Sequence, residues 1–108
     1  MLGIKGAKVF NGRAAAPAGT EVLVEGNRIM AVGEGVIPHE AETIDGSGMT
    51  LMPGMVEGHC HPSFTGVDEP AELGRIHPER HMLLTARNLK LLLEHGFTSI
   101  FEAASAKP

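Results

Sequence analysis

Two histidines separated by a single residue are the first feature of this sequence with a recognisable chemistry. His59 and His61 flank Cys60 at the end of a segment that Pro62 closes. On a strand, residues i and i+2 point to the same face, so both imidazoles can converge on one metal ion while Cys60 points the other way. Neutral imidazole is a good ligand for zinc and for several other divalent metals. The spacing therefore predicts part of a metal site.

The position of this pair on its strand strengthens the prediction. Pro62 has no N–H to donate and ends the strand, so the histidines lie at its C-terminal end. Active sites of parallel α/β barrels lie at that end. By the same alternation Glu57 shares the face of the histidines, either as a partner that orients an imidazole or as a structural carboxylate at the base of the strand. Because His-x-His also arises by chance, the surrounding sequence has to show whether this pair is part of a metal site.

The elements that would position these histidines fall into two halves, with a change of composition near Pro53-Gly54. The first half predicts short strands separated by turns, at residues 2–10, 21–25, 28–32, 43–44 and 49–52. Gly26-Asn27 between two of them is a hairpin signal, because both residues tolerate positive φ. Short strands at this spacing indicate a small sheet or part of a sandwich.

The second half predicts a strand, a loop, a helix and a strand, at residues 55–60, 62–77, 78–95 and 98–102. Pro78 suits the first position of a helix, and Gly96 suits the residue just past its end. The helix carries an apolar stripe at helical spacing, formed by Leu83, Ala86, Leu89 and Leu93. This order is that of a βαβ unit with parallel strands.

The segment Pro53-Gly-Met-Val-Glu-Gly-His-Cys-His61 resembles the signature of the amidohydrolase superfamily, in which Pro-Gly leads through an acidic residue to His-x-His. Three earlier stretches are similar to the strands that open these enzymes, namely 4–10, 24–32 and 44–54, and 95–100 resembles the second barrel strand. The acidic position is more often Asp in the family, whereas here it is Glu57. The resemblance covers essentially the whole chain and identifies it as the N-terminal portion of an imidazolonepropionase- or prolidase-like metal-dependent hydrolase.

The resemblance implies an α/β fold class with a β-rich N-terminal part. Residues 1–52 would be a portion of a β-sandwich (composite) domain. Residues 53–108 would be the truncated start of a (β/α)₈ or TIM barrel, with its first βαβ unit. Since such a barrel takes about 250 residues, we expect the rest of the barrel, or a partner chain, to be needed for order.

The family also implies a chemistry. His59 and His61 would hold the more buried of one or two divalent ions, zinc being the expected metal. Water activated by the metal would hydrolyse a non-peptide or dipeptide-like C–N bond of a small molecule. Glu102, at the end of the second strand, is a candidate for contact with substrate or with a metal ligand. The remaining ligands and the general base belong to later strands, so no residue here is assigned as catalytic and the chain alone is expected to be inactive.

Other residues with possible chemistry have simpler explanations. Among the remaining histidines, His95 suits a helix C-terminus, and Pro78 places His77 before the first helical turn, away from a shared face with His81. We expect His39 to be a loop residue and Cys60 a buried, inert thiol. The loop after the first strand could cover the site through Phe64, with Asp68-Glu69 as its acidic patch. Ser105 and Lys107 follow the second strand, without an assigned role.

The amino-acid composition argues against several classes of binding partner. The 108 residues carry a formal net charge of −4 and no run of Lys or Arg, which argues against nucleic acid and anionic membranes. No apolar stretch approaches the roughly 20 residues of a membrane span, and no secretory signal is recognisable. The single cysteine cannot form an internal disulfide. A cytoplasmic protein, homo-oligomeric when complete, is therefore the expectation.

Two alternatives remain open at the level of sequence. The first is a non-catalytic structural or regulatory protein built on the amidohydrolase fold. The presence of both His59 and His61 favours the enzyme, because a purely structural strand needs neither. The second is a small β-rich metal-binding module that is complete in itself, which two convergent ligands alone make less favourable.

Overall fold

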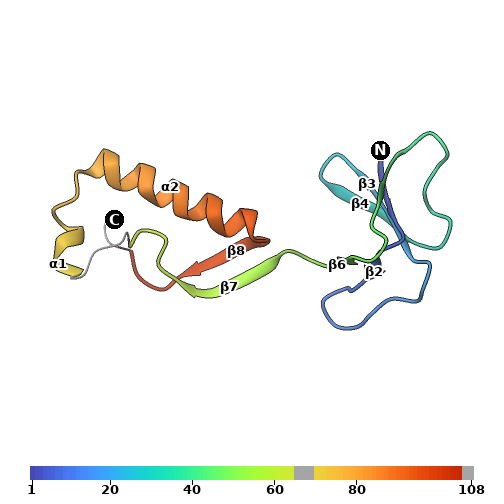
Figure 1. Cartoon of the computed structure of the whole chain (residues 1–108), viewed down its shortest axis with the longest axis horizontal. Coiled ribbons are helices and arrows are strands. Elements are labelled where there is room, and N and C mark those ends of the chain that lie inside the picture. The colour runs from blue at the N-terminus through green and yellow to red at the C-terminus, as the bar shows by residue number, and fades with distance from the viewer. Residues whose placement is uncertain (65–69, 106–108) are drawn as a thin grey trace. The chain divides into compact units, whose positions relative to one another are not determined.

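The computed structural model describes residues 1–64 and 70–105 and has the mixed α/β composition that the sequence predicts (Figure 1). The chain divides into two compact units, Met1–Pro53 and Gly54–Pro108. The first unit contains six strands, and the described part of the second contains two strands and two helices. Three residues weighed in the sequence lie outside the described residues, namely Asp68, Glu69 and Lys107. None of the described helices is both long enough and apolar enough to cross a bilayer.

A four-stranded sheet forms the centre of the first unit. It contains β1 (Leu2–Lys5), β3 (Glu21–Glu25), β4 (Arg28–Gly33) and β5 (Glu42–Asp45), in the order β4-β3-β1-β5. Strand β1 pairs antiparallel with β3 and parallel with β5. The two large apolar side chains buried in this unit, Val22 and Leu23, both belong to β3. The core of the unit therefore lies on its central strands.

The turns of the first unit show where local sequence sets the chain path. The predicted hairpin is confirmed: β3 and β4 are joined by Gly26-Asn27, of which only Gly26 takes a positive φ, +56°. The prediction of one strand over residues 2–10 is wrong. Gly6, with φ +78°, separates β1 from a short β2 (Lys8–Val9), which pairs parallel with β6 (Thr50–Leu51). A residue with that φ cannot continue an extended strand.

The second unit is a strand–helix–strand unit. Strand β7 (Met55–Cys60) and strand β8 (Phe97–Glu102) are parallel, as predicted, and α2 (Pro78–Glu94) connects them and lies along the pair (Figure 1). Pro78 occupies the first turn of the helix, and Gly96 takes φ +89° just past its end. A one-turn helix, α1 (Pro70–Leu73), lies in a segment predicted as loop, because four residues are too short to show helical periodicity.

The apolar stripe of α2 is not the face that the helix turns to the strands. Leu83 is 72% exposed and Leu93 is 61% exposed, so this stripe is largely open to solvent. The covered positions are instead His81, Leu84, Thr85, Asn88 and Leu92. The helix has apolar residues on more than one face, and periodicity alone does not indicate which face packs on the sheet. Three of the five covered residues are polar, and they are important for the site.

Candidate metal centre

His59 and His61 lie together at the C-terminal end of β7, as their spacing predicts. Their ring centroids are 5.1 Å apart and their planes are nearly perpendicular, at 86°. His59 is exposed and His61 is half-buried. The pairing of β7 with β8 is irregular between Glu57 and Cys60, next to the two rings. Irregular pairing of this kind redirects side chains and is common beside functional sites.

The ring of His61 is held from two sides. Its Nδ1 lies 3.2 Å from the carbonyl oxygen of Ala104, in the segment that follows β8. Because a carbonyl can only accept, this hydrogen bond requires the proton on Nδ1 and leaves the lone pair on Nε2. Phe64 stacks on the same ring, with centroids 4.6 Å apart and an interplanar angle of 17°. His61 is thus oriented with one nitrogen available to a ligand.

Glu57 contacts the backbone beside the histidines. Its Oε1 accepts a hydrogen bond of 3.1 Å from the backbone N–H of His59. This contact holds the backbone at His59, while an interaction of Glu57 with an imidazole ring stays a prediction.

Cys60 does not join the candidate site. Its thiol is half-buried and donates to the carbonyl of Phe101 at 3.7 Å. Burial raises the pKa of the Cys60 thiol, and the nearby carboxylates of Glu57 and Glu102 raise it further. A thiol kept protonated at neutral pH is a poor nucleophile and a poor metal ligand.

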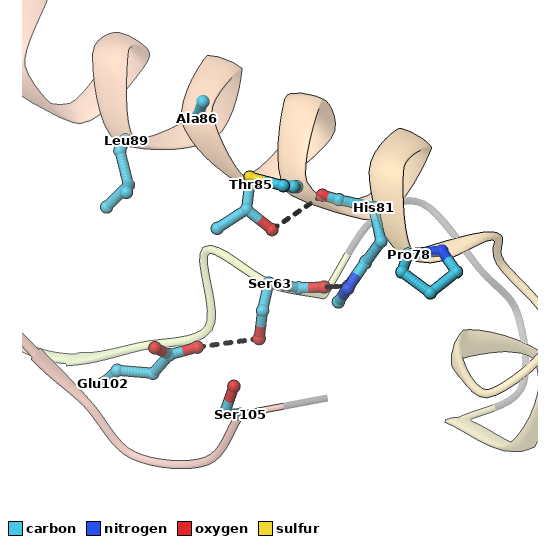
Figure 2. A pocket seen from close by; sticks show the side chains of 9 residues that line it. Ser63, Pro78, His81, Thr85, Ala86, Leu89, Glu102 and Ser105 are labelled. Carbon is cyan, nitrogen blue, oxygen red and sulfur yellow. Dashed lines mark hydrogen bonds between the residues drawn. The ribbon is translucent and has the colours of Figure 1, made fainter. Parts of the chain in front are cut away.

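Glu102 reaches the segment after His61 from the end of β8. Its Oε1 accepts a hydrogen bond of 2.7 Å from the hydroxyl of Ser63 (Figure 2). Both residues line an open pocket of about 490 Å³ below α2, together with His81 and Ser105 and the helix side chains Pro78, Met82, Thr85, Ala86 and Leu89. Glu102 is therefore hydrogen-bonded to the loop next to the histidines, and its contact with a substrate remains a prediction.

The two imidazoles suit a zinc ion as part of its ligand set. They are nitrogen donors two positions apart in the sequence, and His61 already has the hydrogen-bonded Nδ1 that metal-binding histidines usually show. Within residues 1–64 and 70–105, no third His, Cys, Asp or Glu joins them in a group able to hold a metal ion. A catalytic zinc site normally has three protein ligands. The donor set fits a metal and is incomplete.

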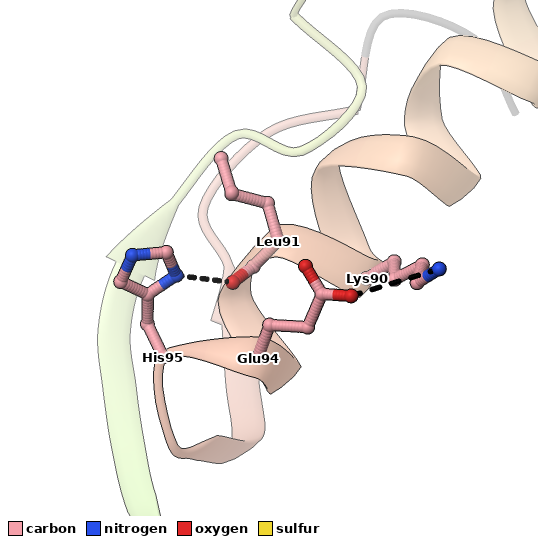
Figure 3. Close-up of polar contacts among 4 residues, drawn as sticks. All are labelled: Lys90, Leu91, Glu94 and His95. Atoms are coloured by element: carbon pink, nitrogen blue, oxygen red, sulfur yellow. Dashed lines mark hydrogen bonds and ion pairs between the residues drawn. The ribbon is translucent and has the colours of Figure 1, made fainter.

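The other histidines have different environments. His95 follows the last turn of α2, and its Nδ1 donates to the carbonyl of Leu91 at 2.8 Å (Figure 3). It therefore caps the C-terminus of the helix, in line with its predicted position. His77 is exposed and its Nδ1 contacts the carboxylate of Glu79, whereas His81 is buried against Ser63. The structure does not bring His77 and His81 together as a ligand pair.

Sequence reasoning missed three residues that hold the loop after β7. Ser63, His81 and Asn88 bond that loop to the rest of the unit. The spacing of His81, Thr85 and Asn88, four and three residues apart, was a usable signal for a polar helix face.

Comparison with curated proteins finds similarity to enzymes, over part of this chain. A 5′-deoxyadenosine deaminase of Methanothrix thermoacetophila is 42% identical over 45 residues, which are 42% of this chain and 11% of that protein. A dihydroorotase of Streptococcus thermophilus is 31% identical over 61 residues, which are 56% of this chain and 14% of that protein. The chain thus spans a small part of the length of these relatives. No family model matches it.

Solved structures match nearly the whole chain. A prolidase, solved with N-methylphosphonate-L-proline, is 25% identical with a TM-score of 0.80, covering 94% of this chain and 25% of the prolidase. An amidohydrolase that is 23% identical has a TM-score of 0.82 over 94% of this chain and 25% of its own, and it supports the fold.

Proposed function

Because the chain belongs to the amidohydrolase superfamily, we propose that it supplies the first two metal ligands of a metal-dependent hydrolase. The related proteins are hydrolases of carbon–nitrogen bonds. In this proposal the protein that carries this chain hydrolyses a non-peptide or dipeptide-like C–N bond of a small molecule. The first unit is then a portion of a β-sandwich, and β7, α2 and β8 begin a (β/α)₈ barrel.

The orientation of His61 is the observation that supports the proposal best. The hydrogen bond to the Ala104 carbonyl places a proton on Nδ1, so Nε2 is the nitrogen left to bind a metal. His59 places a second ring 5.1 Å away. A strand with a purely structural role needs neither ring nor this orientation.

Each residue of the centre has a defined role in this proposal. His59 and His61 bind the metal, and Glu57 holds the backbone at His59. Phe64 covers one face of the His61 ring and limits access of water to it. A divalent metal, with zinc as the proposed ion, lowers the pKa of a bound water toward neutrality and polarises the scissile carbonyl when present.

Two ligands do not complete such a centre, so we propose that the 108 residues alone are inactive. Further ligands and a general base have to come from the rest of the protein or from a partner chain. Metal-dependent turnover by the 108-residue polypeptide alone would show this proposal to be wrong. We further propose a cytoplasmic protein, homo-oligomeric when complete.

Metal binding tests the proposed function directly. In the protein that carries this chain, His59→Ala and His61→Ala should each weaken zinc binding, measured by competition with a chromophoric chelator. The expected loss exceeds the roughly 10- to 100-fold caused by losing a residue that only orients a ligand. His39→Ala is the matched control, because His39 is exposed in the first unit. Equal zinc affinity in all three variants would exclude the centre.

A further inference from the structure

A polar stripe lies on the covered face of α2. His81, Thr85 and Asn88 follow one another at helical spacing, and all three are at least half-buried. Polar side chains on a covered helix face require hydrogen-bond partners, because an unpaired buried polar group is costly. Two of the three find their partners in the loop immediately after His61.

The partners of His81 and Asn88 are adjacent backbone carbonyls. The Nε2–H of His81 donates to the carbonyl of Ser63, and the Nδ2 of Asn88 donates to the carbonyl of Pro62 at 2.8 Å. From another side Glu102 accepts the hydroxyl of Ser63, and Figure 2 shows His81 and Glu102 both reaching this serine. Ser63 is 4% exposed and His81 is 6% exposed. The loop is therefore bound to both α2 and β8.

Thr85 differs from its two neighbours on the stripe. Its hydroxyl donates to the carbonyl of His81, one turn back in the same helix, at 2.9 Å. It lies on the same covered helix face as His81 and Asn88, and its side chain is also polar. The stripe therefore contains its own matched control.

We propose that His81 and Asn88 are positioning residues that set the place of His61 through the backbone of residues 62 and 63. Pro62 follows His61 directly, so a shift of its carbonyl moves the imidazole relative to the Ala104 carbonyl and to His59. Only the metal-binding part of this inference rests on the proposed function. The order of the loop does not depend on a metal.

The amide of Phe64 reports the order of the loop, because it donates to the carbonyl of His61 at 2.9 Å. In the metal-free protein, His81→Leu and Asn88→Leu should each accelerate its hydrogen exchange by about tenfold, the effect of losing one buried hydrogen bond. The same variants should weaken zinc binding by about tenfold, the lower end of the range for residues that orient a ligand. His81→Gln retains an N–H donor at a similar position and should restore both values toward those of the wild type.

Thr85→Val removes a hydroxyl from the same helix face and should change neither measurement. The proposal is overturned if His81→Leu and Asn88→Leu leave the Phe64 amide unchanged, or if Thr85→Val accelerates it equally. If His81→Leu fails to fold, the other two variants still test the proposal. Asn88→Leu shows whether losing the hydrogen bond accelerates exchange, and His81→Gln shows whether keeping a donor preserves the wild-type values. If His59→Ala keeps full zinc affinity, the proposed function fails, while Phe64 exchange still decides on the positioning role.

Discussion

At the scale of residues, His61 makes three contacts, which come from two other parts of the second unit. Its ring bonds the Ala104 carbonyl after β8 and stacks on Phe64, and its own carbonyl accepts the Phe64 amide. These contacts restrict the conformational freedom of His61. A mobile histidine would lose that freedom only on binding a metal. Preorganisation of this kind favours binding because less entropy remains to be lost.

The spacing of His59 and His61 could be interpreted from sequence, because strand alternation is local. The Ala104 carbonyl and the Ser63–Glu102 bond could not be predicted, since the bonded residues are 43 and 39 positions apart. Such contacts depend on the return of the chain through α2 and β8. The two histidines proposed as ligands could therefore be identified from the sequence, whereas the groups that orient them could not.

Asp45 offers a test of residue-scale electrostatics in the first unit. The hydroxyl and the backbone N–H of Ser47 donate to its Oδ1, at 2.6 and 2.9 Å, and hold its pKa below the ordinary value of 3.8, with a smaller effect from Lys5. Both bonds favour the charged carboxylate. A depressed pKa stabilises the fold above pH 3.8, and this stabilisation is lost as the pH falls through the pKa of the folded state.

We therefore expect Ser47→Ala to raise the pKa of Asp45 toward 3.8 in an NMR titration of its carboxyl carbon. Asp45→Asn should be less stable than the wild type at pH 7, and the difference should vanish below the folded-state pKa. Lys5→Gln is the control, with a smaller change of pKa. An unchanged Asp45 pKa in Ser47→Ala would contradict the hydrogen-bond origin of the shift.

At the scale of elements, the close approach of β8 explains why a glycine stands at position 54, directly before β7. A Cβ at this position would lie 2.0 Å from Oγ1 and 2.6 Å from Cβ of Thr98, at the start of β8. The Cβ of Thr98 is fixed by the backbone, so rotation of the side chain cannot relieve this contact. The two parallel strands approach each other here because residue 54 has no side chain.

Gly54→Ala should accordingly destabilise the pairing of β7 with β8 by about 1–3 kcal/mol, the usual cost of overpacking. The measurement is the urea midpoint, with hydrogen exchange of the Met55 amide, which donates to Gly96, as the local probe. Gly58→Ala is the matched control in the same strand, because a Cβ there meets nothing within 4 Å. Equal effects of the two substitutions would exclude close packing as the cause.

The bounds of helices and strands were predicted well where the sequence pattern was long. Prediction failed where the pattern was short, or where apolar residues occurred on more than one face of a helix. The 17 residues of α2 and the six of β7 were placed almost to the residue. The break at Gly6 was missed because a glycine within a strand pattern does not reveal its φ. The covered face of α2 was missed because packing against β8, and not the helix itself, selects it.

At the scale of the whole molecule, both units leave apolar surface open. In the first unit an apolar hollow of about 340 Å³ is lined mainly by aliphatic side chains, including Ile4, Val22, Val24, Ile29, Val32 and Leu51. In the second unit large exposed side chains occur on both strands and the helix, among them Val56, Met82, Leu83, Leu93 and Phe101. Among the described residues only three large apolar side chains are buried, Val22, Leu23 and Leu73. So small a core provides little free energy of folding.

The 108-residue polypeptide on its own should therefore bind a hydrophobic dye such as ANS and unfold over a broad temperature range. Leu83→Glu with Leu93→Glu should reduce dye binding while keeping the helix content seen by circular dichroism, because both side chains are exposed on α2. Leu84→Glu, on the covered face, should instead lower the helix content, since it buries an unpaired charge. A sharp thermal transition of a monomer that binds no dye would mean that the exposed apolar faces do not destabilise the polypeptide. The two units would then be stable without further cover, against what their exposed side chains imply.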